Sequence, residues 1–197
     1  MTQTRRVALI GMVGAVSFLV AFVLGTALNL ATGTPLTGGL ANAVLTAAAL
    51  TTGVCAMPTF GTGTFLWLVF AFLSIPTMTM GPPGPHKLLV GALGGLLWDV
   101  SLYVCRGRKW AFPLAATVMT GAIVVLTFGT LVVFGLPGAD KLAKALPFLL
   151  VVYLPLGWLG GWLGEHIYAT RLRKLLAGNS SQMDAEETQG PGGPAVN

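Results

Sequence analysis

Long apolar segments, separated by short breaks that are polar or rich in Gly and Pro, make up most of the chain. Between Val7 and His86 there is no Asp, Glu, Lys or Arg. Because a soluble domain places most of its charged residues on its surface, this segment indicates a chain surrounded by lipid. About 20 apolar residues cross the hydrocarbon core as a helix. The pattern predicts six such helices, over residues 7–31, 36–57, 63–80, 88–105, 110–136 and 146–170.

The sequence marks some boundaries between these helices more clearly than others. Only Pro58, Gly61 and Gly63 mark a turn between the second and third helices, so a re-entrant or broken arrangement is an alternative there. The first helix follows two arginines as a signal sequence would, but it is too long for one, and further spans follow. We expect a six-helix transmembrane domain over residues 1–176. Residues 177–197 are rich in Gly, Ser, Gln, Glu and Pro and are predicted to form a disordered cytoplasmic tail.

Composition and charge agree with a membrane protein. Hydrophobic residues make up 54% of the chain and charged residues 9%, and the mean hydropathy is +0.80. A mass of 20.4 kDa leaves no room for a soluble catalytic domain beside six spans. The net charge of +5 would suggest nucleic acid in a soluble protein. Here the basic residues lie between apolar segments, which is the positive-inside pattern, so no nucleic-acid partner is expected.

The distribution of the basic residues predicts the orientation. Six spans place both termini on one side of the membrane. Eight basic residues fall on that side and three on the other: Arg5, Arg6, Arg106, Arg108, Lys109, Arg171, Arg173 and Lys174 against Lys87, Lys141 and Lys144. Because cytoplasmic loops carry the excess of Lys and Arg, we expect an all-α integral protein of the cytoplasmic membrane. It is a compact bundle of six transmembrane helices with both termini cytoplasmic.

Residues that could carry chemistry are few and scattered. His86 and His166 are predicted on opposite sides of the membrane, and no group of Cys, His or carboxylates has the spacing of metal ligands. Cys55 and Cys105 fall within or at the end of apolar segments and are expected to be buried free thiols. We therefore predict no catalytic residues, no metal and no cofactor. A small membrane enzyme and a structural or assembly subunit are the alternatives.

Asp99 is a carboxylate inside a predicted span, where an ionised group costs about 2.5–3.5 kcal/mol on insertion scales. One interpretation is a coupling or gating group. The other is a structural carboxylate that pairs with Arg106, Arg108 or Lys109 near the inner interface.

Small residues recur at four-residue spacing, which lets helix backbones approach closely in a membrane. Such pairs occur in the fourth and sixth predicted helices and argue for a compact bundle: Gly91 with Gly95, Gly157 with Gly161, and Gly160 with Gly164. In the first helix Ala8, Gly11 and Ala15 form a similar strip. That strip either packs inside the bundle or docks another membrane subunit.

The segment before the fourth helix, residues 81–87, contains three prolines and two glycines and so forms a rigid loop on the outer face. It places His86 and Lys87 at a helix N-terminus, which suits a ligand of anionic or carbonyl character. The alternative is a tight turn with a lysine that reaches the interface. Asn42, Tyr153 and Trp158 are weaker substrate-binding candidates that would converge on a pocket open to the outside.

Three segments resemble the substrate-binding S components of energy-coupling-factor transporters. The opening Arg5-Arg6-Val7-Ala8-Leu9-Ile10-Gly11 to Ala15 is similar to the family's basic start and small-residue first helix. Gly84-Pro85-His86-Lys87 through Gly95 to Asp99 is similar to its loop, Gly-rich helix and terminal Asp. Gly157 to Gly164, followed by Arg171-Leu172-Arg173-Lys174, is similar to its last helix.

This resemblance extends over most of residues 5–175. It implies a high-affinity, outward-facing site for a vitamin or similar micronutrient, with Ala8, Gly11 and Ala15 docking a membrane T component. It also implies a pair of cytoplasmic ATPases. The chain has no Walker motif, so ATP hydrolysis would belong to another subunit.

Overall fold

The fold is a bundle of six α-helices, seen in a computed structural model that describes residues 3–33, 35–77, 79, 83–135 and 139–174. The described residues contain helices and no strands, as the sequence predicts. The predicted tail, residues 177–197, lies outside the described residues. The helices are α1 (Gln3–Thr32), α2 (Pro35–Ala56), α3 (Thr62–Ser74), α4 (His86–Val104), α5 (Ala111–Val133) and α6 (Ala139–Ile167), and α6 continues as a π-helical turn, Tyr168–Leu172.

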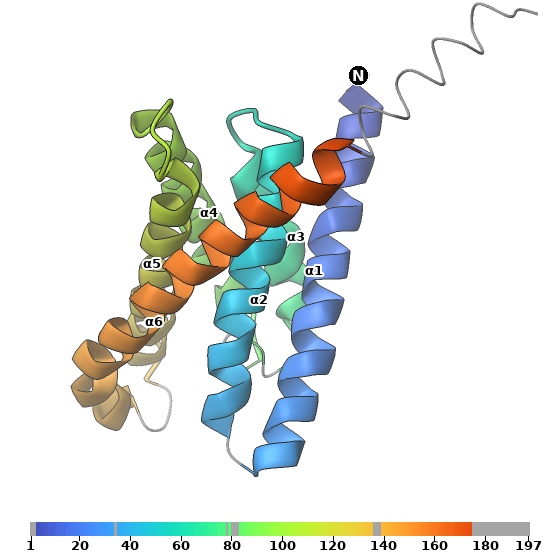
Figure 1. The fold of residues 1–197 in the computed structure, drawn as a ribbon. Coiled ribbons are helices and arrows are strands. Elements are labelled where there is room, and N and C mark those ends of the chain that lie inside the picture. The colour runs from blue at the N-terminus through green and yellow to red at the C-terminus, as the bar shows by residue number, and fades with distance from the viewer. Residues whose placement is uncertain (1–2, 34, 78, 80–82, 136–138, 175–197) are drawn as a thin grey trace, which may run out of the picture.

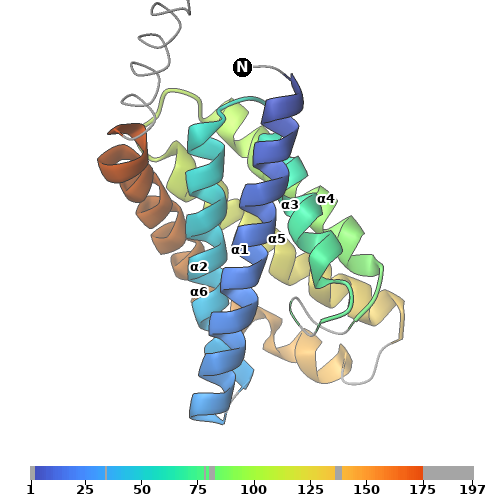
Figure 2. The ribbon, with the colours of Figure 1, turned by 90° about the vertical axis from the view of Figure 1, so that its right-hand side faces the viewer.

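Consecutive helices run in opposite directions (Figures 1 and 2). The start of α1, the connections α2–α3 and α4–α5, and the end of α6 lie at one end of the bundle, which we call the terminal end. The connections α1–α2, α3–α4 and α5–α6 lie at the opposite end, which we call the distal end. Helix α6 is inclined and crosses the outside of α5 and α2 (Figure 1).

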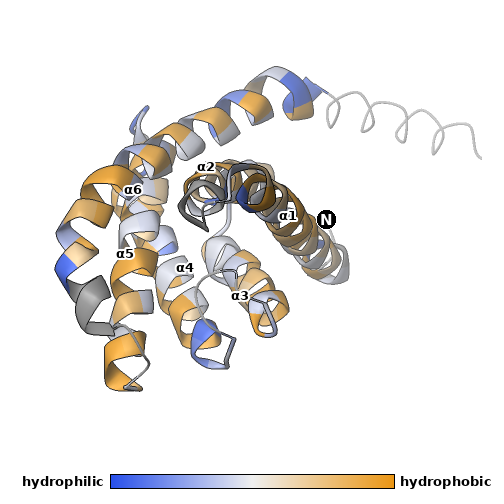
Figure 3. Ribbon diagram, turned by 90° about the horizontal axis from the view of Figure 1, so that it is seen from below, coloured by the Kyte–Doolittle hydropathy of each residue, from blue (hydrophilic) through white to orange (hydrophobic). Residues whose placement is uncertain are grey.

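In the part of the chain that the structure describes, five helices are long and apolar enough to cross a membrane: α1, α2, α4, α5 and α6. Figure 3 shows apolar residues along most of the helices and hydrophilic residues mainly near their ends. Helix α3 is the exception, with 13 residues. The prediction that this helix continues to residue 80 is wrong, because it ends at Ser74. Pro76 lacks the backbone N–H that a continued helix needs, and the backbone turns at Ile75 instead.

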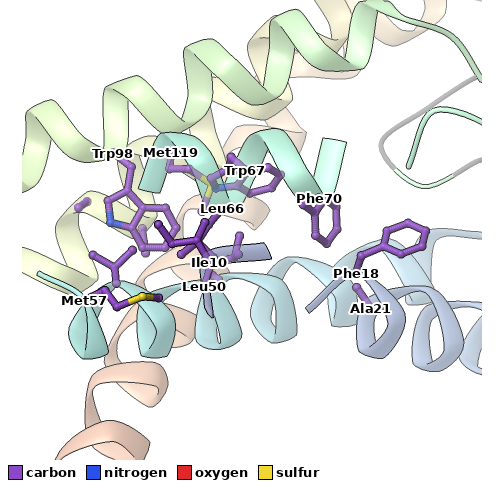
Figure 4. Close-up of a cluster of buried hydrophobic side chains, with 14 residues drawn as sticks. Ile10, Phe18, Ala21, Leu50, Met57, Leu66, Trp67, Phe70, Trp98 and Met119 are labelled. Carbon is purple, nitrogen blue, oxygen red and sulfur yellow. The ribbon is translucent and has the colours of Figure 1, made fainter. Parts of the chain in front are cut away.

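The core lies where α1 to α5 meet. Figure 4 shows Trp98, Leu66 and Leu50 together near its centre, and none of these three side chains is exposed to solvent. Phe70 packs beside Trp67, with ring centroids 5.1 Å apart. These residues come from α2, α3 and α4, so one face of the short helix α3 packs into the core, while Phe65 and Phe72 on its other face are exposed.

Glycines let the helices pack closely, as their spacing predicts. On α6, a Cβ atom at Gly161 would lie 2.7 Å from Ala116 Cβ of α5, and one at Gly160 would lie 2.6 Å from Ala47 Cβ of α2. On α4, a Cβ atom at Gly95 would lie 2.6 Å from the Thr64 Cα of α3. Contacts this short leave no room for a side chain, so the interhelical distances depend on glycine at these positions.

Candidate functional site

Helix α3 is held at both of its ends by charged side chains of its antiparallel neighbour α4. Lys87 and Asp99 are the only Lys, Arg, Asp or Glu residues of α4, and both are buried. Asp99 bonds the first turn of α3, and Lys87 bonds carbonyls at its last residue and just beyond. We call this arrangement the α3–α4 clamp.

At the terminal end of α3, the Asp99 carboxylate accepts three hydrogen bonds. Asp99 Oδ1 accepts the Gly63 N–H at 3.0 Å, and Oδ2 accepts the Thr64 N–H at 2.9 Å and the Thr64 hydroxyl at 2.6 Å. Helix α3 has no acidic residue in its own first turn, and its N-cap residue, Gly61, has no side chain to cap it. Asp99 therefore satisfies backbone donors that a helix N-terminus leaves unpaired.

Asp99 does not pair with the cations that the sequence suggests as its partners. Arg106, Arg108 and Lys109 are exposed, and the carboxylate bonds the backbone of α3 rather than one of these cations. Asp99 thus bonds a different partner from the one predicted for a structural carboxylate. A role in coupling stays a prediction.

At the distal end of α3, the Lys87 ammonium is fully buried. Lys87 Nζ donates to the carbonyl oxygens of Ser74 at 2.8 Å, Thr77 at 2.6 Å and Thr79 at 2.8 Å. An ammonium group has three N–H donors, so the chain itself uses all of them. The ligand contact predicted for Lys87 is untested, and it would require one of these three carbonyls to be released.

The separation of Lys87 and Asp99 along α4 matches the length of α3, and their charges match the dipole of α3. Lys87 and Asp99 are 12 positions apart along α4, which corresponds to about 18 Å, and the first and last residues of α3 are likewise 12 positions, or about 18 Å, apart. A helix carries partial positive charge at its N-terminus and partial negative charge at its C-terminus. The carboxylate and the ammonium therefore stand at the complementary ends. Because the hydrocarbon core of a bilayer is about 30 Å thick, a helix as short as α3 needs such partners for its end groups.

Helix α1 joins the same first turn of α3. Arg6 Nη2 donates to the Thr62 hydroxyl oxygen at 3.2 Å, and that hydroxyl donates to the Met57 carbonyl at 2.9 Å. Sequence reasoning did not identify this contact or the clamp. Two features of the sequence could have indicated the clamp. Pro76 shortens the third helix, and the separation of Lys87 and Asp99 on the fourth helix matches that shortened length.

Two other substrate-binding candidates carry buried polar atoms without a hydrogen-bond partner. These atoms are His86 Nε2 and Asn42 Oδ1. The His86 ring lies beside Phe134, which directly follows α5, with centroids 6.3 Å apart. The Asn42 side chain lies against Gly25 of α1. Both residues are in the distal half of the bundle, as the prediction of an outward-facing site requires.

The remaining two candidates are both on α6. The Tyr153 hydroxyl would lie 2.8 Å from a Cβ atom at Gly39, which precedes Asn42 by one helical turn of α2. Tyr153 therefore contacts α2 one helical turn from Asn42. Trp158 is 43% exposed. Within the described part of the chain, no hydrogen bond joins any two of the five substrate-binding candidates.

The small-residue strip of α1 is open. Ala8 is exposed, Ala15 is half-buried, and a Cβ atom at Gly11 would meet nothing within 4 Å. The neighbouring Gly14 is instead buried against Val69 of α3. Gly11 is therefore not an internal packing position, and the docking of a partner at this strip stays a prediction.

Other reactive groups are dispersed. Cys55 and Cys105 are buried free thiols, and His166, far along the chain from His86, stacks on Trp162. In the residues that the structure describes, no three His, Cys, Asp or Glu side chains come together as metal ligands. Comparisons with protein-family models, with characterised proteins and with solved structures give no match.

Proposed function

We propose that this chain is the membrane-embedded substrate-binding subunit of an uptake system of the energy-coupling-factor type, for a vitamin or a similar small micronutrient. In this proposal all six helices lie in the cytoplasmic membrane with both termini in the cytoplasm, and the distal end faces outward. A separate T component and cytoplasmic ATPases supply the energy. The chain itself binds the substrate and catalyses no reaction.

The observation that carries the proposal is that two of the six unpartnered buried side-chain atoms in the described residues, Asn42 Oδ1 and His86 Nε2, lie in the distal half of the bundle. Buried polar groups are nearly always hydrogen-bonded, and each one left unpaired costs about 1–3 kcal/mol. A substrate with N–H or O–H groups would satisfy both atoms. The ring of Phe134 beside His86 adds an apolar surface for a planar substrate.

The resemblance of the first, fourth and sixth helices to S components supports the same proposal. The open strip at Ala8, Gly11 and Ala15 offers a surface on which a T-component helix could pack closely. A structural or assembly subunit remains the second candidate. It differs in having no use for the unpartnered atoms.

Native mass spectrometry of the purified protein tests the proposal by detecting a co-purifying small molecule. Binding of that molecule is then measured for Asn42→Leu and His86→Phe, with His166→Phe as the matched control. We expect each of the first two variants to lose roughly 10-fold to 100-fold in affinity, as expected when a hydrogen bond of about 1.5–3 kcal/mol is lost. The control should bind as the unchanged protein does.

The stability of the ligand-free variants makes the test sharper. Because Asn42→Leu removes an unsatisfied acceptor, its ligand-free stability should hold or rise while its affinity falls. Absence of any retained small molecule, together with unchanged uptake in both variants, would instead favour the structural subunit.

A further inference from the structure

The connection between α4 and α5, residues 105–110, is an ordered turn. The Arg108 N–H donates to the Cys105 carbonyl at 3.1 Å, and the Ala111 N–H donates to the Arg108 carbonyl at 3.1 Å. Gly107 has a φ of 85°, in the left-handed region that glycine adopts without strain. The backbone of this turn therefore holds its side chains in a defined arrangement. We call residues 105–110 the cationic turn.

The cationic turn carries three exposed positive charges, Arg106, Arg108 and Lys109. The Arg108 guanidinium lies 4.9 Å from the centroid of the Trp110 ring, in a cation–π contact. Stacking of this kind holds the guanidinium plane in place and leaves its N–H edges available. Among the described residues, no ion pair neutralises any of the three cations.

Apolar surface continues directly from these charges. Tyr103 and Val104, in the last turn of α4, are 70% and 72% exposed. The segments on either side of the turn, His86–Val104 and Ala111–Val133, are candidate membrane spans. The turn therefore lies where a chain leaves the hydrocarbon and enters the headgroup layer, which is also where Trp side chains concentrate.

We propose that the cationic turn is a binding site for an anionic phospholipid of the adjacent leaflet. The headgroup phosphate would be held by Arg108, whose planar fork of donors matches phosphate oxygens, and by Lys109. An acyl chain would lie along Tyr103 and Val104. An acidic soluble protein would match the charges but not this apolar surface, so the phospholipid is the occupant that the chemistry favours.

The end of α6 provides a matched control. Arg171, Arg173 and Lys174 are also exposed and comprise the same two arginines and one lysine as the cationic turn. They lie at a helix end, and no cation–π contact is present among them in the described residues. If general attraction to anionic lipid were the only effect, the two clusters would contribute equally.

The experiment measures lipid retention by native mass spectrometry after exchange into phosphatidylglycerol or phosphatidylcholine. One variant replaces all three cations of the cationic turn with Gln, and the other replaces those of the α6 end. General attraction to an anionic surface acts on both clusters alike, whereas charge-assisted hydrogen bonds from Arg108 and Lys109 to the phosphate belong to the turn alone, and each such bond contributes roughly 10-fold or more in binding. We expect the turn variant to lose retained phosphatidylglycerol by roughly 100-fold, and the α6 variant to lose much less.

Trp110→Leu separates a built site from simple charge, because it leaves the net charge unchanged. It should reduce phosphatidylglycerol retention several-fold and leave phosphatidylcholine unaffected. Only variants with the thermal stability of the unchanged protein are compared. If the triple variant does not fold, the single variant Arg108→Gln replaces it.

Three outcomes would overturn the proposal. Equal losses from the two clusters would show diffuse attraction. Equal retention of the two lipids would show a purely apolar contact. Displacement of the lipid by an acidic peptide or by inorganic phosphate at a similar concentration would identify a soluble partner instead.

Discussion

Replacement of Lys87 by Met tests the α3–α4 clamp directly. Methionine is similar in length and in helix propensity but has no donor. It would leave the carbonyls of Ser74, Thr77 and Thr79 without the ammonium that now bonds them. The side chain remains buried, so the main change is the loss of hydrogen bonding at the C-terminal end of α3.

The expected magnitude follows from these three contacts. A hydrogen bond inside a membrane protein contributes about 0.6 kcal/mol on average and about 1.7 kcal/mol at most, so three bonds contribute roughly 2–5 kcal/mol. The Ser74 carbonyl also accepts the Thr77 N–H at 3.0 Å and the Thr77 hydroxyl at 2.9 Å. It therefore keeps partners, and we expect a loss nearer the lower figure, about 2–3 kcal/mol.

Reversible unfolding in mixed micelles of increasing SDS content measures this free energy. The protein is studied without ligand, so that a lost ligand contact cannot account for the result. Lys144→Met is the matched control, because Lys144 is exposed on α6. A surface substitution of this kind changes stability by about 0.5 kcal/mol or less.

An unfolding free energy for Lys87→Met within about 0.5 kcal/mol of the unchanged protein would refute the clamp as a stabilising device. If that variant also lost substrate binding, Lys87 would be a ligand contact, as the sequence predicts. A large loss of ligand-free stability would instead assign to Lys87 the structural role described above.

Three further substitutions test the other half of the clamp, the helix packing and the small-residue strip of α1. Asp99→Asn keeps one acceptor oxygen but places an NH₂ group against amide donors of α3, so the unfolding free energy should fall by about 1–3 kcal/mol; unchanged stability would contradict the capping role. Gly161→Leu should lower stability by at least about 1–3 kcal/mol, because its side chain would meet Ala116. Gly11→Leu should leave folding and ligand binding intact while blocking co-purification with a T component, and reduced binding in that variant would show that the strip belongs to the bundle core.

The number and approximate positions of the helices could be read from the sequence. A bilayer imposes a length of about 20 apolar residues on each span, and this constraint acts on local composition alone. The largest departures from the predicted bounds are in two helices: α3 ends at Ser74, because of a proline two residues later, and α6 begins at Ala139 rather than at residue 146. Spacing of small residues also identified Gly160 and Gly161 as sites of close approach.

Which surfaces meet was decided by the tertiary structure. Neighbouring glycines of α6 pack on different helices, Gly160 on α2 and Gly161 on α5, although their spacing patterns are the same. The sequence marked Lys87 and Asp99 as unusual, but it could not identify their partners. Those partners are mainly backbone groups, which every residue carries, and they lie 8 to 36 positions away. Only the antiparallel packing of α3 on α4 brings the two charges to the two ends of one short helix.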